Sequence, residues 1–123
     1  MTDTLITFDT AKLAKDVEFN IECYHAFDNI GSESISPYTY KYSNIDSGTI
    51  VRPTQSLLQK WIREKHNIHI VIDRDEDMWK PEIYSLIGGN KHIPYGFKNY
   101  KTYEYALDAA LLNALKTIQK HIL

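Results

Sequence analysis

The last twenty or so residues constrain the fold most, because they are typical of one long amphipathic helix. Its apolar stripe consists of Tyr103, Leu107, Leu111, Ala114, Ile118 and Ile122. Thr102 precedes the stripe as the expected N-cap, and Lys116 and Lys120 suit the negative end of the helix dipole. Such a helix is about 30 Å long and can cross a whole small domain.

The middle of the chain predicts a second helix followed by a hairpin. Thr54 is the expected N-cap, and Asn67 can close the helix in the left-handed conformation. The apolar positions at helical spacing are Leu57, Leu58, Trp61 and Ile62. Residues 68–73 and 83–87 then read as two strands, joined through the charged turn 73–77. This pattern predicts an antiparallel hairpin.

The N-terminal half carries weaker signals of the same kinds. A short helix is expected after an N-cap at Asp9 or Thr10 and is expected to end near Phe19 or Asn20. Residues 21–27 and 38–42 are expected to be strands, the second with clean two-residue alternation.

These elements predict a single α+β domain spanning residues 1–123. The expected order is α-β-β-α-β-β-α. Hairpins separated by helices favour an antiparallel sheet of about four strands, with the helices packed mainly on one face. A length of 123 residues is typical of one domain.

The charge of the chain argues against a general affinity for nucleic acid. The formal net charge is −2, whereas duplex-binding domains usually carry a strong basic excess. Cys23 is the only cysteine, no signal peptide is recognisable, and no apolar run approaches the roughly 18 residues of a membrane span. We therefore expect a cytoplasmic protein that does not enter a membrane.

The sequence predicts no catalytic residue, no metal site and no cofactor. The alternating acids of residues 73–77 resemble the start of a calcium loop, but Met78 and Tyr84 stand where that loop needs Gly and Glu. Cys23, His25 and Asp28 are near one another in the sequence, as a nucleophile, its base and an orienting acid would be. In a strand, however, Cys23 and His25 would lie about 7 Å apart along one face, too far for direct hydrogen bonding.

Two segments are candidate binding surfaces. The first is the tyrosine strand, whose side chains could stack on bases or sugars, or could simply cover the sheet; its residues are Tyr38, Tyr40 and Tyr42. The second is the loop 89–101, where cations alternate with aromatic residues as in surfaces that bind single strands or acidic proteins. Its candidate residues are Lys91, His92, Tyr95, Phe97, Lys98, Tyr100 and Lys101. The alternative for this loop is aromatic side chains folded under the sheet beside solvated lysines.

Three segments resemble an uncharacterised family of small proteins from gut Bacteroidetes and their phages and prophages. They are the Pro-Thr-Gln-Ser-Leu-Leu-Gln-Lys-Trp motif that begins at Pro53, the run Tyr-Glu-Tyr-Ala-Leu-Asp-Ala-Ala that begins at Tyr103, and residues 6–15. The resemblance implies a mobile-element accessory protein and assigns no activity.

We therefore expect a non-enzymatic binding or interaction protein of a phage or prophage, with a protein as its partner. A single-stranded nucleic-acid binding protein and a small enzyme of unassigned chemistry are the alternatives. A homodimer formed through the long C-terminal stripe is left open.

Overall fold

The computed structural model describes residues 4–28, 30–40, 48–85, 91–93 and 98–122, and of residues 34–40, 91–92 and 121–122 it describes the backbone alone. Within these residues, three helices and six strands follow one another along the chain. They are α1 (Phe8–Asp16), β1 (Cys23–Phe27), β2 (Glu33–Tyr40), β3 (Ile50–Val51), α2 (Gln55–His66), β4 (Ile68–Asp75), β5 (Met78–Ser85), β6 (Lys91–His92) and α3 (Tyr103–Ile122). The protein is α+β, as predicted.

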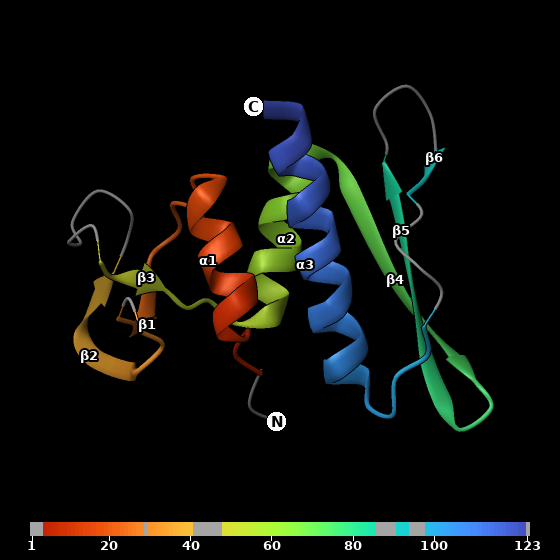
Figure 1. Ribbon diagram of the computed structural model, residues 1–123, viewed down its shortest axis with the longest axis horizontal. Helices are drawn as coiled ribbons and strands as arrows, with labels where there is room; N and C mark the ends of the chain where they lie inside the picture. Colours follow the sequence, from red (N-terminus) through yellow and green to blue (C-terminus); the bar gives the residue numbers. More distant parts are fainter. Residues whose placement is uncertain (1–3, 29, 41–47, 86–90, 94–97, 123) are drawn as a thin grey trace.

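The strands form two separate antiparallel sheets with the helices between them (Figure 1). The strand orders are β2-β1-β3 and β4-β5-β6. The prediction of one sheet of about four strands was wrong, because it assumed that the two hairpins pair edge to edge. Instead, each hairpin takes its third strand from the chain that follows it, and these two-residue strands are too short to show alternation in the sequence.

Helix α3 lies at the centre of the molecule and contacts α1, α2, β4 and β5. Two rows of its side chains are buried, the small Ala106, Ala110 and Ala114 and the larger Leu107, Leu111, Leu115 and Ile118. A helix that is apolar on more than one side packs against several neighbours at once. Four residues of the predicted stripe, Leu107, Leu111, Ala114 and Ile118, are thus covered by the chain's own core. Tyr103 is 40% exposed and does not belong to the core, and the side chain of Ile122 lies outside the described part of the structure.

The predicted second helix is confirmed as α2, with both of its predicted capping residues. The Thr54 hydroxyl oxygen accepts a hydrogen bond from the Leu57 N–H at 3.3 Å, and Asn67 is left-handed with φ of 54°. Leu58, Trp61 and Ile62 are buried as their spacing predicts.

The β4–β5 hairpin is longer than predicted. Asp75 pairs with Met78, so only Glu76 and Asp77 form the turn, and Glu76 is left-handed with φ of 55°. The predicted turn had covered residues 73–77, because charged residues in a strand look like a turn when only hydrophobic alternation is counted. Ile68 and Ile70 are buried on one face, as predicted.

The first sheet is held by a tight turn between β1 and β2. The Asp28 carboxylate accepts hydrogen bonds from the N–H groups of Ser32 at 2.8 Å and Ile30 at 3.0 Å, which lowers the pKa of Asp28. Gly31 follows with φ of +92°, beside the Phe8 ring.

Helix α1 begins two or three residues earlier than expected, because its N-cap is Thr7 instead of Asp9 or Thr10, and it ends at Asp16. In the described part of the chain, no helix is long and apolar enough to span a membrane.

Candidate functional site

Trp79 is the centre of an aromatic and basic surface at the turn end of the β4–β5 hairpin. The guanidinium of Arg74, its partner across the hairpin, lies 4.9 Å from the centre of the Trp79 ring. The Tyr103 ring meets Trp79 edge-on, with centroids 5.5 Å apart and an interplanar angle of 89°. We call this surface the hairpin platform and define it as Arg74, Trp79, Lys98, Tyr100, Lys101 and Tyr103.

The segment before α3 is tied to Trp79 through its backbone. The Trp79 N–H donates to the Tyr100 carbonyl at 2.7 Å, and the Tyr100 N–H donates to the Trp79 carbonyl at 2.8 Å. The Thr102 hydroxyl then accepts from the Tyr105 N–H at 3.1 Å, which starts α3 as predicted. Two backbone bonds and a helix cap therefore fix residues 100–105 over the end of the sheet.

The register of the hairpin explains why these aromatic residues meet. Side chains two apart in a strand share a face, so Arg74 lies on the face of Ile70 and Ile72, toward the helices. Helix α3 starts only at Tyr103, so its buried rows do not extend over Trp79. Among the described residues, the Tyr103 ring and the Arg74 guanidinium lie against Trp79, which remains half-exposed.

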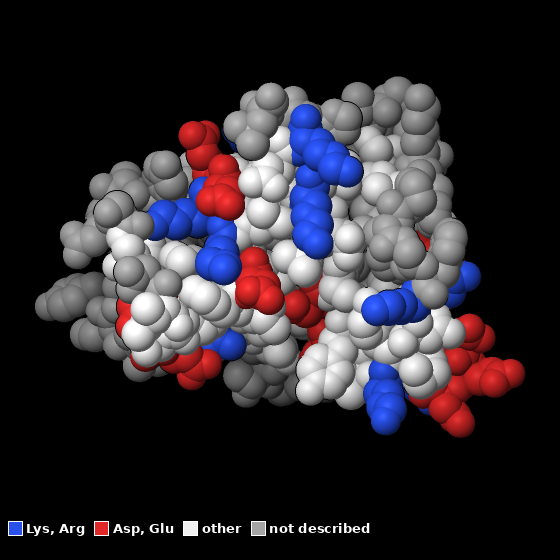
Figure 2. All heavy atoms as spheres, viewed as in Figure 1, with Lys and Arg blue, Asp and Glu red and all other residues white. Residues whose placement is uncertain are grey.

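Charges of both signs surround the platform. Lys98 and Lys101 are exposed, and acidic residues gather at the hairpin turn (Figure 2). One of these acids, Asp75, accepts a hydrogen bond from the Asn99 side-chain amide at 3.0 Å. The other exposed acids at the turn are Asp73, Glu76 and Asp77. This end of the molecule is thus mixed in charge and rich in aromatic surface.

The structure brings together only part of the predicted loop site. Lys98, Tyr100 and Lys101 belong to the platform, whereas Tyr95 and Phe97 lie outside the described residues. Lys91 and His92 form β6, opposite Ser85 and Tyr84, so the segment is not the uninterrupted loop that was predicted. This short strand was not predicted because both of its residues, Lys91 and His92, are polar.

The structure describes a strand over two of the three residues of the predicted tyrosine strand. Tyr38 and Tyr40 lie in β2, and Tyr40 pairs with Cys23 of β1. Tyr42 lies outside the described residues, and the role of this strand stays a prediction. Tyr24 of β1, which the sequence did not single out, is 56% exposed.

The sequence patterns did not indicate three of the six platform residues. Arg74 was assigned to a turn, Trp79 to no element, and Tyr103 to the apolar stripe of α3. The sequence offered one indication, because Arg74 and Trp79 are equally distant from the centre of the 74–79 run, which lies between Glu76 and Asp77. In a hairpin with a two-residue turn they must face each other.

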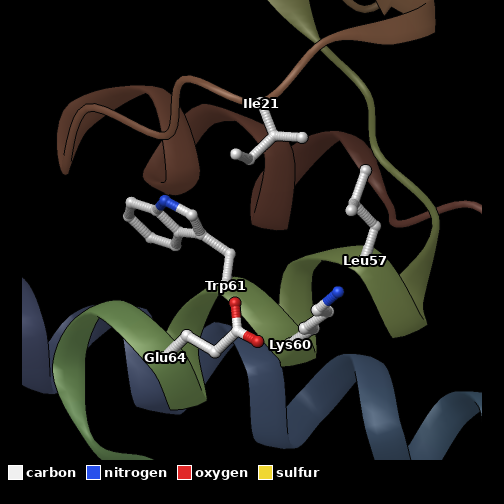
Figure 3. A pocket seen from close by; sticks show the side chains of 5 residues that line it. All are labelled: Ile21, Leu57, Lys60, Trp61 and Glu64. Atoms are coloured by element: carbon white, nitrogen blue, oxygen red, sulfur yellow. The ribbon is translucent and has the colours of Figure 1, made fainter.

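A shallow pocket lies elsewhere, between α2 and the segment after α1 (Figure 3). Ile21 faces Leu57 and Trp61, while Lys60 and Glu64 carry the charges at the rim. Its volume of about 170 Å³ is well below the roughly 300 Å³ at which small-molecule sites begin. The pocket can hold one side chain of a partner and is too small for most cofactors.

His66 packs against Trp61, which lines this pocket, with the two ring centroids 5.0 Å apart. Its Nε2 atom is buried and has no hydrogen-bond partner among the described residues. Burial, and then the positive charge of Lys65, lowers the pKa of His66. Both effects disfavour the charged form of the ring.

Cys23 and Asp28 are both engaged in structural contacts. Burial raises the pKa of Cys23 to about 12, and its thiol donates to the Ile21 carbonyl at 3.4 Å. The Asp28 carboxylate is occupied by the turn that follows β1. Neither group has the surroundings of an activated nucleophile or of the acid that orients its base. Among the described residues, no group of three or more His, Cys, Asp and Glu side chains could hold a metal ion.

Comparisons with protein-family models, with curated proteins and with solved structures find no match to this chain.

Proposed function

We propose that this chain is a non-enzymatic binding module that holds a protein partner through the hairpin platform. The observation that carries the proposal is the cluster of Arg74, Trp79 and Tyr103, with Lys98 and Lys101 exposed at its border. Together with the sequence resemblance, it favours a cytoplasmic accessory protein of a phage or prophage.

The composition of the platform fits a protein partner. Trp, Tyr and Arg are the residues most enriched where interfaces gain their binding energy. The platform is also rigid, because backbone bonds between Trp79 and Tyr100 fix the chain beneath the rings. A prearranged surface loses little conformational entropy when it binds.

A single-stranded nucleic acid is the second candidate. An aromatic ring beside a guanidinium and two lysines could stack a base and neutralise phosphate. The acids at the hairpin turn oppose this, because they would repel a phosphate backbone that passes over Trp79. A protein with charges of both signs meets no such penalty.

The test is affinity capture from a lysate of a gut Bacteroidetes host, with the wild-type chain and matched variants as bait. Arg74→Ala and Tyr103→Ala remove the guanidinium and the exposed ring. Tyr24→Ala is the control, because it removes an exposed tyrosine from β1, in the other sheet from Trp79; Tyr24 is 56% exposed and Tyr103 is 40% exposed. We expect the same protein to be retained by the wild type and the control and lost from both platform variants.

Retention of the same proteins by all four baits would contradict the proposal. Fluorescence anisotropy with single-stranded DNA and RNA at low salt distinguishes the second candidate. Binding that Tyr103→Ala abolishes and salt weakens would favour nucleic acid over a protein partner.

A further inference from the structure

Strand β4 has one edge with which no described strand pairs, because it stands first in the order β4-β5-β6. The far side of β5 shows which β4 groups face this edge. The Ile83 carbonyl accepts from the Ile93 N–H at 2.8 Å, and Trp79 exchanges two bonds with Tyr100. Ile83 and Trp79 therefore point their backbone groups away from β4. In an antiparallel ladder, their β4 partners Ile70 and Arg74 then point theirs toward the free edge.

Ile72 lies between these two residues and follows the same alternation. The edge thus presents the N–H and carbonyl groups of Ile70, Ile72 and Arg74. Helix α2 reaches one of them, since the Gln59 amide donates to the Ile70 carbonyl at 3.3 Å. A carbonyl oxygen has two lone pairs, so this bond leaves a place for a second donor.

We propose that β4 pairs antiparallel with β4 of a second copy of this chain, about a two-fold axis at Ile72. Ile72 then faces Ile72 of the second copy. Ile70 of each copy faces Arg74 of the other copy, which makes two further pairs. Each of these pairs exchanges two backbone bonds, about six in all. The β4-β5-β6 sheets of the two copies then become one continuous sheet across the dimer. This inference is independent of the proposed function.

Charge complementarity along β4 favours a second copy of β4 as the partner strand, paired in the register centred on Ile72. On the outer face, exposed His69 lies opposite exposed Asp75 of the second copy, and symmetry repeats this contact. An imidazole N–H facing a carboxylate stabilises a cross-strand pair. A register centred on Arg74 would instead place two guanidinium groups opposite each other. The strand is therefore complementary to itself in the Ile72-centred register.

Sedimentation equilibrium tests the dimer. We expect His69→Asp to weaken dimerisation at least about threefold and His69→Lys to strengthen it by a similar factor. Lys116→Gln and Glu64→Gln are matched controls, because they make the same charge changes at exposed helix positions. A wild-type chain that stays monomeric into the high micromolar range would overturn the proposal, and so would equal effects in the controls.

Oxidative cross-linking tests the register. Directly opposed residues have Cα atoms about 5.5 Å apart, so the Ile72→Cys variant should form a disulfide between copies. In the same register the two Arg74 positions lie four residues apart, about 13 Å, beyond the roughly 7 Å limit for a disulfide. Equal cross-linking of Arg74→Cys would overturn the register. Tyr103→Ala should leave the dimer intact, so failure of the platform and failure of the dimer are distinguishable.

Discussion

The Asp108 carboxylate of α3 accepts hydrogen bonds from both the backbone N–H and the hydroxyl of Thr7, the residue before α1. The distances are 3.1 Å and 2.9 Å, and the buried Thr10 hydroxyl donates to the same carboxylate at 3.0 Å. Thr7 makes no side-chain cap of its own. A side chain from another helix therefore caps α1 and fixes it against α3.

Asp108→Ala should destabilise the fold by about 2 kcal/mol, because it leaves the buried Thr10 hydroxyl and the start of α1 without their acceptor. Asp108→Asn keeps one acceptor oxygen and should cost less. Urea unfolding followed by circular dichroism measures both. Asp77→Asn removes an exposed acid from the hairpin turn and should be neutral; an equal loss in this control would point to net charge instead of the cap.

Gly31→Ala should cost about 1 to 2 kcal/mol. Gly31 has φ of +92°, and an added Cβ would lie 3.3 Å from the Phe8 ring. A side chain in this conformation is strained, and the ring would have to move as well. The matched control is Ile30→Ala, since Ile30 is 79% exposed. Thermal unfolding that shows the same loss for both variants would contradict this account.

Stability should fall as the pH falls below the ordinary histidine pKa of 6.5, because of His66. The folded chain resists protonation of His66, whereas the unfolded chain accepts the proton. The stabilisation from neutral His66 is fully present above pH 6.5 and is lost as the pH drops toward the lowered pKa of His66 in the folded chain. His66→Phe should flatten the difference in unfolding free energy between about pH 7.5 and about pH 5.5. His69→Gln is the control and should keep it.

Cys23 should react slowly with a thiol reagent in the native state. Its side chain is 6% exposed and its pKa is raised to about 12, so little thiolate forms near neutral pH. Denaturant should restore the rate of an ordinary thiol. The exposed Arg74→Cys variant provides a fast-reacting reference within the same chain. Native Cys23 labelling as rapid as this reference would show that the thiol is accessible.

The hairpin platform shows how far the sequence could predict the site. Lys98, Tyr100 and Lys101 were identified because cations and aromatic residues alternate locally. The sequence only hinted at Arg74 and Trp79 through their symmetric placement about the turn, and the pairing of Asp75 with Met78 then brings them face to face. Sequence distance alone gave no reason to join them with Tyr103.

The sequence by itself determined the helices and the β4–β5 hairpin. Their signals are local: Thr54 and Asn67 bond or bend within a few residues, and the isoleucines of β4 alternate along one strand. The tertiary structure alone decided that the strands form two sheets, that α3 lies between them, and that Asp108 caps α1. These outcomes depend on contacts between residues as far apart as Thr7 and Asp108. No local sequence pattern contains the free energies of such contacts.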